Sequence, residues 1–187
     1  MDAFSYLSVL LSIILGLAIT QILKGMRGLA LSRAHVVIYW PTLVWCALLL
    51  VINVQGWWAM FGLREIRSWT FAMFSIVLLQ TIVTYLLSGL VLPDFYGERS
   101  IDLRVHYFAH RRLFFGLFIA ALLISLAKDL VLSGHITDRV NLAFHLCFIA
   151  LSAGGCISAK DWYHKLLCML SAVGFGLYIA LLFAQLR

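Results

Sequence analysis

The feature that most constrains this chain is a series of uninterrupted apolar runs, each long enough to cross a lipid bilayer. A helical span needs about 20 predominantly apolar residues, because the hydrocarbon core is about 30 Å thick and a helix rises about 1.5 Å per residue. The runs are continuous and do not alternate with polar residues, which is typical of helical spans. We expect six of them, at about residues 4–23, 41–61, 69–92, 113–132, 140–158 and 166–186.

The composition indicates the same class of protein. Hydrophobic residues make up 64% of the 187 positions and charged residues 12%, and the mean hydropathy is +1.01. A soluble domain of this size would need more polar side chains to cover its surface. Lipid offers no partner to backbone N–H and C=O groups, so the spans must be helical. The sequence therefore predicts an all-α fold, a polytopic transmembrane helix bundle that forms a single integral membrane domain over residues 1–187.

The basic residues predict the partners and the orientation. In a membrane protein a net charge of +6 indicates cytoplasmic loops beside an anionic lipid bilayer, and no nucleic acid. The loops after the first, third and fifth spans carry nine of the 14 Lys and Arg residues: Lys24, Arg27, Arg33, Arg99, Arg104, Arg111, Arg112, Lys160 and Lys165. The positive-inside rule places these loops in the cytoplasm. We therefore expect a multi-pass protein of the bacterial cytoplasmic (inner) membrane, with both termini extracytoplasmic.

The longest stretch that cannot sit in lipid is Asp94–Arg112, DFYGERSIDLRVHYFAHRR. Within it Glu98, Asp102, His106 and His110 follow one another at intervals of four residues, which places them on one face of a helix. No Gly or Pro separates this stretch from the fourth span. We expect one long helix whose first part, about residues 100–112, lies at the cytoplasmic membrane interface.

The histidines in these loops form a candidate metal site. Imidazole and carboxylate groups are ligands that zinc or iron takes, and residues four apart on a helix present their side chains in line. The predicted topology adds two histidines from other loops at the same face. The candidate set is Asp102, His106, His110, His164 and His35.

An alternative for the same face is that its histidines contact lipid headgroups and loop backbone, and the chain has no HExxH motif. Arg104, Arg111 and Arg112 raise the energy of a bound cation. They favour an anionic group instead, either a lipid headgroup or a phosphate-bearing ligand. The simpler expectation is that no cofactor binds, with zinc or iron as the alternative.

Polar side chains inside the predicted spans form a second candidate site. Such groups are costly when they face lipid, so we expect them to face the interior of the bundle. Two interpretations remain open: they line a path for a solute or an ion, or they form interhelical hydrogen bonds of roughly 1 kcal/mol each. The set is Asn53, Gln55, Gln80, Thr84, Tyr85 and His145.

Small residues at intervals of four predict faces where another helix packs closely. The first span contains Ser12 and Gly16, and the last contains Ala172, Gly176 and Ala180, followed by Ala184. The partner helix is expected either within the chain or in a second copy, which would make the protein a homo-oligomer.

Several short segments resemble those of small bacterial inner-membrane proteins that have six spans and no assigned activity. These segments are YLSVLLSIILGLAITQIL, YWPTLVW, FGLR, LVLPD and HYFAHRR. The similarity covers nearly the whole chain. It implies a six-span bundle and no activity, so it assigns no site residues.

Three functions are compatible with these patterns, and the first two are not enzymatic. One is a small transporter or channel lined by the polar groups of the spans. Another is a membrane sensor or scaffold that presents Asp94–Arg112 to a cytoplasmic partner. The alternative is a membrane-embedded, metal-dependent enzyme with a histidine and carboxylate site at the cytoplasmic face.

Overall fold

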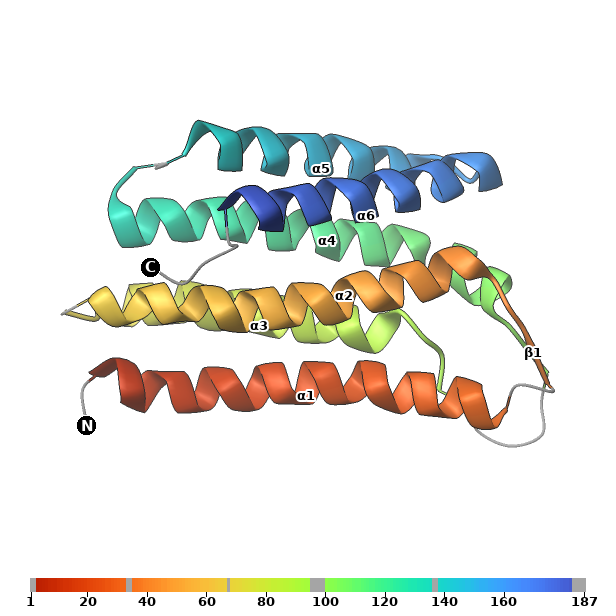
Figure 1. Ribbon diagram of the computed structural model, residues 1–187, viewed down its shortest axis with the longest axis horizontal. Coiled ribbons are helices and arrows are strands. Elements are labelled where there is room, and N and C mark those ends of the chain that lie inside the picture. The colour runs from red at the N-terminus through yellow and green to blue at the C-terminus, as the bar shows by residue number, and fades with distance from the viewer. Residues whose placement is uncertain (1–2, 33–34, 67, 95–99, 136–137, 183–187) are drawn as a thin grey trace.

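The structure, a computed structural model, describes residues 3–32, 35–66, 68–94, 100–135 and 138–182. Within this part of the chain six helices are long and apolar enough to cross a membrane, which confirms the predicted all-α bundle (Figure 1). A short 3₁₀ helix, η2 (Met60–Glu65), follows the second of them directly. The six are α1 (Ala3–Leu31), α2 (Trp40–Ala59), α3 (Phe71–Leu90), α4 (Leu103–Ser133), α5 (Arg139–Ile157) and α6 (Asp161–Leu182).

The helices lie side by side along the long axis of the molecule. α1, α3, α4 and α5 pack each on the next, while α2 packs on α1 and α3, and α6 packs on α5. The chain therefore divides into a first half, α1–α3, and a second half, α4–α6. The halves meet where α3 contacts α4 and where α2 contacts α6.

The helix boundaries follow from local chemistry. The side chains of Thr70, Asp102 and Asp138 accept hydrogen bonds from backbone N–H groups in the first turns of α3, α4 and α5. Pro41 occupies the first turn of α2, where its missing N–H costs little. α4 ends at Gly134, whose φ of 75° is a left-handed conformation that glycine adopts without strain.

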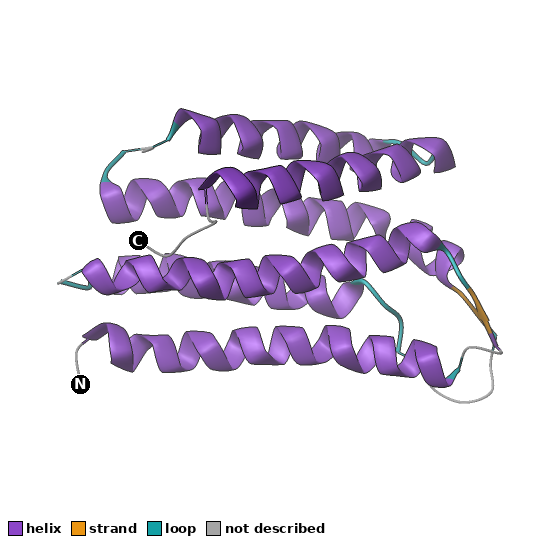
Figure 2. Ribbon diagram, viewed as in Figure 1, coloured by secondary structure: helices purple, strands orange, loops and turns teal. Residues whose placement is uncertain are grey.

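Two helices are longer than a bilayer requires. α4 has 31 residues and α1 has 29, which corresponds to about 46 and about 43 Å of helix against a hydrocarbon core of about 30 Å. Where α1 ends and α4 begins, β1 (Val36–Val37) pairs in parallel with β2 (Ile101–Asp102), as the orange strands of Figure 2 show. We call this end of the bundle the strand end, and the opposite end, with η2 and the start of α5, the far end.

The predicted interfacial helix at about residues 100–112 is therefore part of a longer element. Residues 101–102 form β2, and residues 103–112 are the first turns of α4, which continues unbroken to Ser133. The helix starts at residue 103 because Asp102 caps it. Glu98 lies outside the described residues.

The core at the junction of the halves is aromatic. Trp45 of α2 is 1% exposed, and its ring centroid lies 5.4, 5.5 and 5.5 Å from those of Phe114, Phe115 and Phe118 of α4. All three pairs have the edge-to-face geometry that aromatic rings prefer. This cluster fixes the spacing between α2 and α4.

The small-residue faces do not pack within one copy of the chain as expected. Ser12, Gly16, Gly176 and Ala180 are exposed, and a Cβ added at either glycine would meet nothing within 4 Å. In α1 the buried face is instead formed by a different set of apolar side chains: Leu11, Leu15, Ala18 and Ile22. In α6 only Ala172 of the predicted stripe packs against the core, and Ala184 lies outside the described residues. Contact between these faces and a second copy remains a prediction.

Close helix packing occurs at a different glycine. A Cβ added at Gly155 of α5 would lie 2.9 Å from Phe115 and 3.0 Å from Leu167. Gly155→Leu should therefore destabilise the protein, because overpacking a core costs about 1–3 kcal/mol. The measurement is the thermal unfolding midpoint of the purified protein in detergent.

Gly176→Leu is the matched control, since it makes the same change in a helix where the added side chain meets open space. Its unfolding midpoint should match that of the parent. An equal loss of stability in both variants would contradict this packing and would indicate that a second copy covers Gly176.

Candidate functional site

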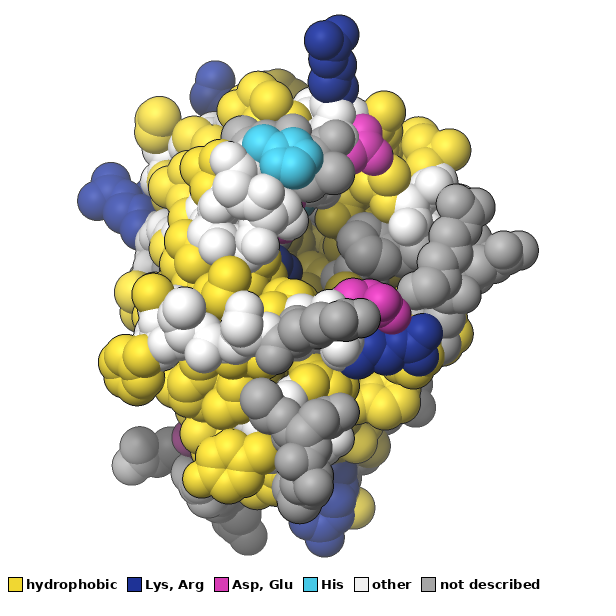
Figure 3. Space-filling model, turned by 90° about the vertical axis from the view of Figure 1, so that its left-hand side faces the viewer, with side chains coloured by type: hydrophobic (Ala, Val, Ile, Leu, Met, Phe, Trp, Pro, Cys, Tyr) yellow, Lys and Arg dark blue, Asp and Glu magenta, His cyan; other side chains and the backbone are white. Residues whose placement is uncertain are grey.

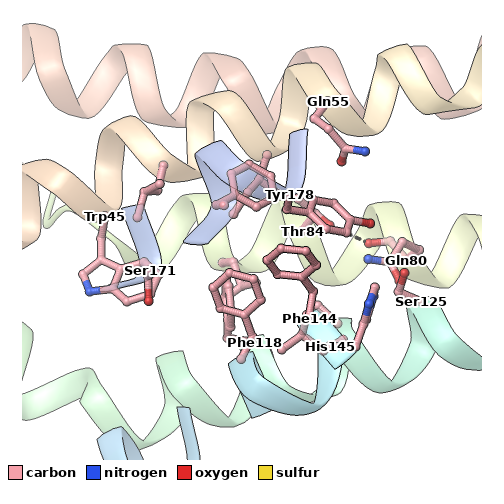
Figure 4. A pocket seen from close by; sticks show the side chains of 17 residues that line it. Trp45, Gln55, Gln80, Thr84, Phe118, Ser125, Phe144, His145, Ser171 and Tyr178 are labelled. Atoms are coloured by element: carbon pink, nitrogen blue, oxygen red, sulfur yellow. Dashed lines mark hydrogen bonds between the residues drawn. The ribbon is translucent and has the colours of Figure 1, made fainter. Parts of the chain in front are cut away.

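A cavity lies between the two halves of the bundle, and its inner part is walled mainly by aromatic side chains. This inner chamber has a volume of about 110 Å³ and is lined by residues from α2, α3, α4, α5 and α6. Figure 4 shows its side chains converging from these helices. The aromatic members of its wall are Trp45, Phe118, Phe144, Phe148, Phe175 and Tyr178.

The outer part of the cavity is more polar and lies toward the far end. We call it the mouth. It has a volume of about 160 Å³, and its lining includes Lys128, Asp129 and Asn141 together with residues of η2. Figure 3, which views the far end, shows a hollow near the middle of the surface. The mouth adjoins the inner chamber because both are lined by Ile52, Gln55, Gln80, Thr84, Ser125 and Tyr178.

Polar side chains gather where the chamber meets the mouth. In Figure 4, Gln55, Gln80, Ser125 and His145 lie together on one side of the cavity, away from Trp45. The Oε1 atom of Gln80 is buried and has no hydrogen-bond partner among the described residues. A buried amide oxygen without a partner carries a desolvation penalty, so this atom is available to a molecule that enters the cavity.

A chain of hydrogen bonds joins the three helices of the second half at the mouth. Asn141 Nδ2 donates to Asp129 Oδ2 at 3.0 Å, and Tyr178 Oη donates to Asn141 Oδ1 at 3.1 Å. His145 Nδ1 lies 2.8 Å from the carbonyl oxygen of Asn141. A carbonyl can only accept, so Nδ1 carries the proton. In the neutral imidazole His145 Nε2 is then the acceptor.

The structure brings together four of the six polar residues predicted to line a path, namely Gln55, Gln80, Thr84 and His145. The other two form contacts between helices. Asn53 is 0% exposed, and its Nδ2 donates to Leu49 O at 2.7 Å and to Ser88 Oγ at 3.0 Å. Tyr85 Oη accepts from Gln21 Nε2 at 3.3 Å, between α3 and α1. The interpretation as interhelical hydrogen bonds holds for Asn53 and Tyr85, whereas a solute path along the other four remains a prediction.

Sequence reasoning missed the polar residues that come from the second half: Ser125, Lys128, Asp129, Asn141 and Tyr178. Lys128, Asp129 and Asn141 lie near the ends of predicted spans, where polar residues are common, whereas Ser125 and Tyr178 are single hydroxyl-bearing residues within spans. The five residues come from three helices of the second half, so no local sequence pattern connects them with the glutamines of α2 and α3.

The predicted metal ligands lie at the strand end, and each described member already has a partner or stands apart. His164 is fully buried: its Nε2 donates to Ser158 O at 2.9 Å, and its Nδ1 accepts from Tyr107 Oη at 3.0 Å. Neither nitrogen is then available to a metal. Asp102 caps α4 by accepting from the N–H groups of Arg104 and Val105 at 2.7 and 3.2 Å.

The remaining histidines of this set do not converge with the first two. The rings of His106 and His110 lie 4.5 Å apart, but His106 Nε2 bonds to Leu90 O at 3.1 Å and His110 Nδ1 bonds to His106 O at 2.9 Å. His35 is exposed, just before β1. Among the described residues no group of three or more His, Cys, Asp or Glu side chains could hold a metal ion.

The three arginines predicted to contact an anionic group, Arg104, Arg111 and Arg112, form different contacts at the strand end. Arg104 Nε lies 3.3 Å from Asp161 Oδ1, and Asp161 also binds Lys165 Nζ at 2.6 Å and Tyr39 Oη at 2.9 Å. Burial and this hydrogen bond raise the pKa of Tyr39, so the phenol keeps its proton and donates. Arg111 donates to Phe108 O at 2.9 Å, whereas Arg112 is exposed. The contact of Arg112 with an anionic headgroup remains a prediction.

Comparison of this chain with protein-family models, with curated proteins and with solved structures finds no match. The site must therefore be interpreted from its own geometry.

The buried hydrogen bond between Tyr107 and His164 at the strand end should contribute to the stability of the protein. Tyr107→Phe removes the hydroxyl that donates to His164 and leaves a buried acceptor without a partner, which should reduce the free energy of unfolding by about 1–3 kcal/mol. Tyr6→Phe, at a side chain that is 72% exposed, is the matched control and should have no effect. Equal unfolding midpoints for both variants in detergent would contradict the assigned hydrogen bond.

Proposed function

We propose that this protein is a small transporter- or channel-like membrane protein that admits a solute from one side of the membrane into the cavity between its halves. The observation that carries the proposal is a polar-lined cavity inside six apolar helices, adjoining a mouth at the far end. Polar side chains at membrane depth mark solute paths when they surround open space. Sites at the interface of two halves are also where transporters bind substrate.

Trp45 closes the cavity toward the strand end. Its side chain lines the inner chamber and also a crevice of about 10 Å³ on the strand side, next to His106, Tyr107 and His110. That volume is at the lower limit for a single water molecule. A solute that entered from the far end would therefore stop at Trp45, and passage would require movement of this side chain relative to α4.

The distribution of basic residues supports an orientation. Lys24, Arg27, Arg104, Arg111 and Arg112 lie at the strand end. Under the positive-inside rule that end faces the cytoplasm, in the cytoplasmic membrane of a bacterium. Both termini and the mouth of the cavity then face the extracytoplasmic side.

A second candidate function is a sensor or scaffold. It is favoured by the ion pair of Arg104 with Asp161, which joins the first turns of α4 and α6, and by the exposed Arg112 further along α4, which is accessible to a cytoplasmic partner. No arrangement of the described residues favours a metal-dependent enzyme.

The proposed cavity predicts a pattern of thiol reactivity. Ser125→Cys should react with a charged maleimide in open membrane fragments, because Ser125 lines both the chamber and the mouth and a thiol there meets water. Leu123→Cys, two positions earlier on the outer face of α4 and 53% exposed, should stay unmodified among acyl chains. Peptide mass spectrometry assigns the modification to a residue and separates it from the four native cysteines.

Glu65→Cys, an exposed position of η2 at the far end, is the positive control for reagent access. A reactive Glu65→Cys together with an unreactive Ser125→Cys would show that water does not enter the cavity and would refute the proposed function.

The proposed orientation makes a separate prediction. A reporter enzyme that is active only in the cytoplasm should be silent when fused to the C-terminus, and one that is active only outside it should be active. The reverse result would place the mouth of the cavity on the cytoplasmic side without affecting the cavity itself.

A further inference from the structure

The mouth of the cavity contains a cation that the chain does not neutralise by direct contact. Lys128 of α4 is partly buried and lines the mouth. Among the described residues no carboxylate forms an ion pair with it. Basic side-chain atoms are visible inside the hollow of Figure 3. A charged side chain at membrane depth is retained where it meets a partner or a water-filled path.

The nearest carboxylate, that of Asp129, is already engaged elsewhere. Neighbouring residues on a helix point about 100° apart, and Asp129 Oδ2 accepts from Asn141 Nδ2 at 3.0 Å. Asn141 Oδ1 in turn accepts from Tyr178 Oη. These bonds connect Asp129 to α5, and its charge acts on Lys128 without a direct ion pair. Lys128 thus lines the mouth, and none of the described ion pairs involves its ammonium group.

The rest of the lining complements an amphipathic molecule. Beside Lys128, the amide groups of Gln55 and Gln80 and the hydroxyl of Ser125 offer hydrogen bonds at the boundary of mouth and chamber. Beyond them the wall is apolar and aromatic. A molecule with a charged head at the mouth and an apolar body in the chamber would satisfy both parts at once.

We propose that the cavity binds a small monocarboxylate with an apolar body, whose carboxylate pairs with Lys128 and whose body lies against the aromatic wall of the inner chamber. This assignment rests on the proposed function, since it requires a cavity that a solute can enter. The chamber volume of about 110 Å³ restricts the body to a group of about the size of a benzene ring.

The test compares benzoate with benzamide, which match in size and shape and differ in charge. Isothermal titration of the purified full-length protein in detergent should show benzoate binding about tenfold or more tightly, because hydrogen bonds to charged groups are stronger than those between neutral groups. Benzoate, at a concentration that saturates its site, should also slow the reaction of Ser125→Cys with maleimide, which locates the bound molecule in the cavity.

Two variants connect this preference to Lys128. Lys128→Gln should abolish the preference, so that benzoate and benzamide bind with about equal affinity. Lys128→Arg keeps the charge and should keep the preference for benzoate. Unfolding midpoints of both variants confirm that each is folded, and the charge-keeping variant reports on the site even if the neutral one is poorly stable.

The outcomes separate this inference from the proposed function. Equal affinities for benzoate and benzamide, no benzoate binding, or a preference that survives Lys128→Gln each overturn the assignment of an anion. A maleimide-reactive Ser125→Cys would in those cases leave the solute cavity in place. An unreactive Ser125→Cys would refute both the proposed function and the assignment of an anion.

Discussion

Lipid supplies no hydrogen-bond partner, and this constraint decides where each polar side chain of the six helices lies. Some hydroxyls bond to a carbonyl of their own helix, as Thr84 does to Gln80 O at 2.8 Å. Others pair across helices, as Asn53 does with Ser88. Others line the open space between the halves, and Gln80 Oε1 is one of several buried polar atoms that have no partner among the described residues. At the cavity this incomplete pairing leaves a polar atom beside open space, where an entering molecule can reach it.

The aromatic cluster around Trp45 gives this cavity its closed end. The ring packs edge-to-face against Phe114, Phe115 and Phe118, so the same contacts that space α2 from α4 also separate the chamber from the strand end. Burial of large aromatic surfaces is a major source of packing energy. The packing energy of the core and the closure of the chamber toward the strand end thus depend on the same side chains.

Sequence reasoning found the elements more reliably than their contacts. Uninterrupted apolar runs locate all six helices, because length and hydropathy depend only on local sequence. The faces of those helices depend on their neighbours. Gly176 and Gly155 look alike in sequence, yet only Gly155 lies against Phe115 and Leu167. The two-residue strands could not be foreseen, since they are too short to show an alternating pattern.

For the candidate sites, too, the sequence predicted local spacing but not the contacts with neighbouring elements. Spacing placed His106 and His110 side by side, and their rings are indeed adjacent. Spacing could not foresee that Leu90 O and Tyr107 would bind the nitrogens of His106 and His164. Lys128 was overlooked for a similar reason, because a lysine near the end of a span is ordinary until the space that it faces is known.

The parallel pairing of β1 with β2 has a mechanical consequence. β1 belongs to the connection after α1 and β2 immediately precedes α4, so this pairing ties the two halves together at the strand end. Three side-chain hydrogen bonds between the halves are also at that end: Tyr39 to Asp161, His106 to Leu90 O and Cys168 to Pro41 O. These ties lie at the end of the bundle opposite the mouth that Lys128 lines, so the halves are joined most directly on the closed side of the cavity.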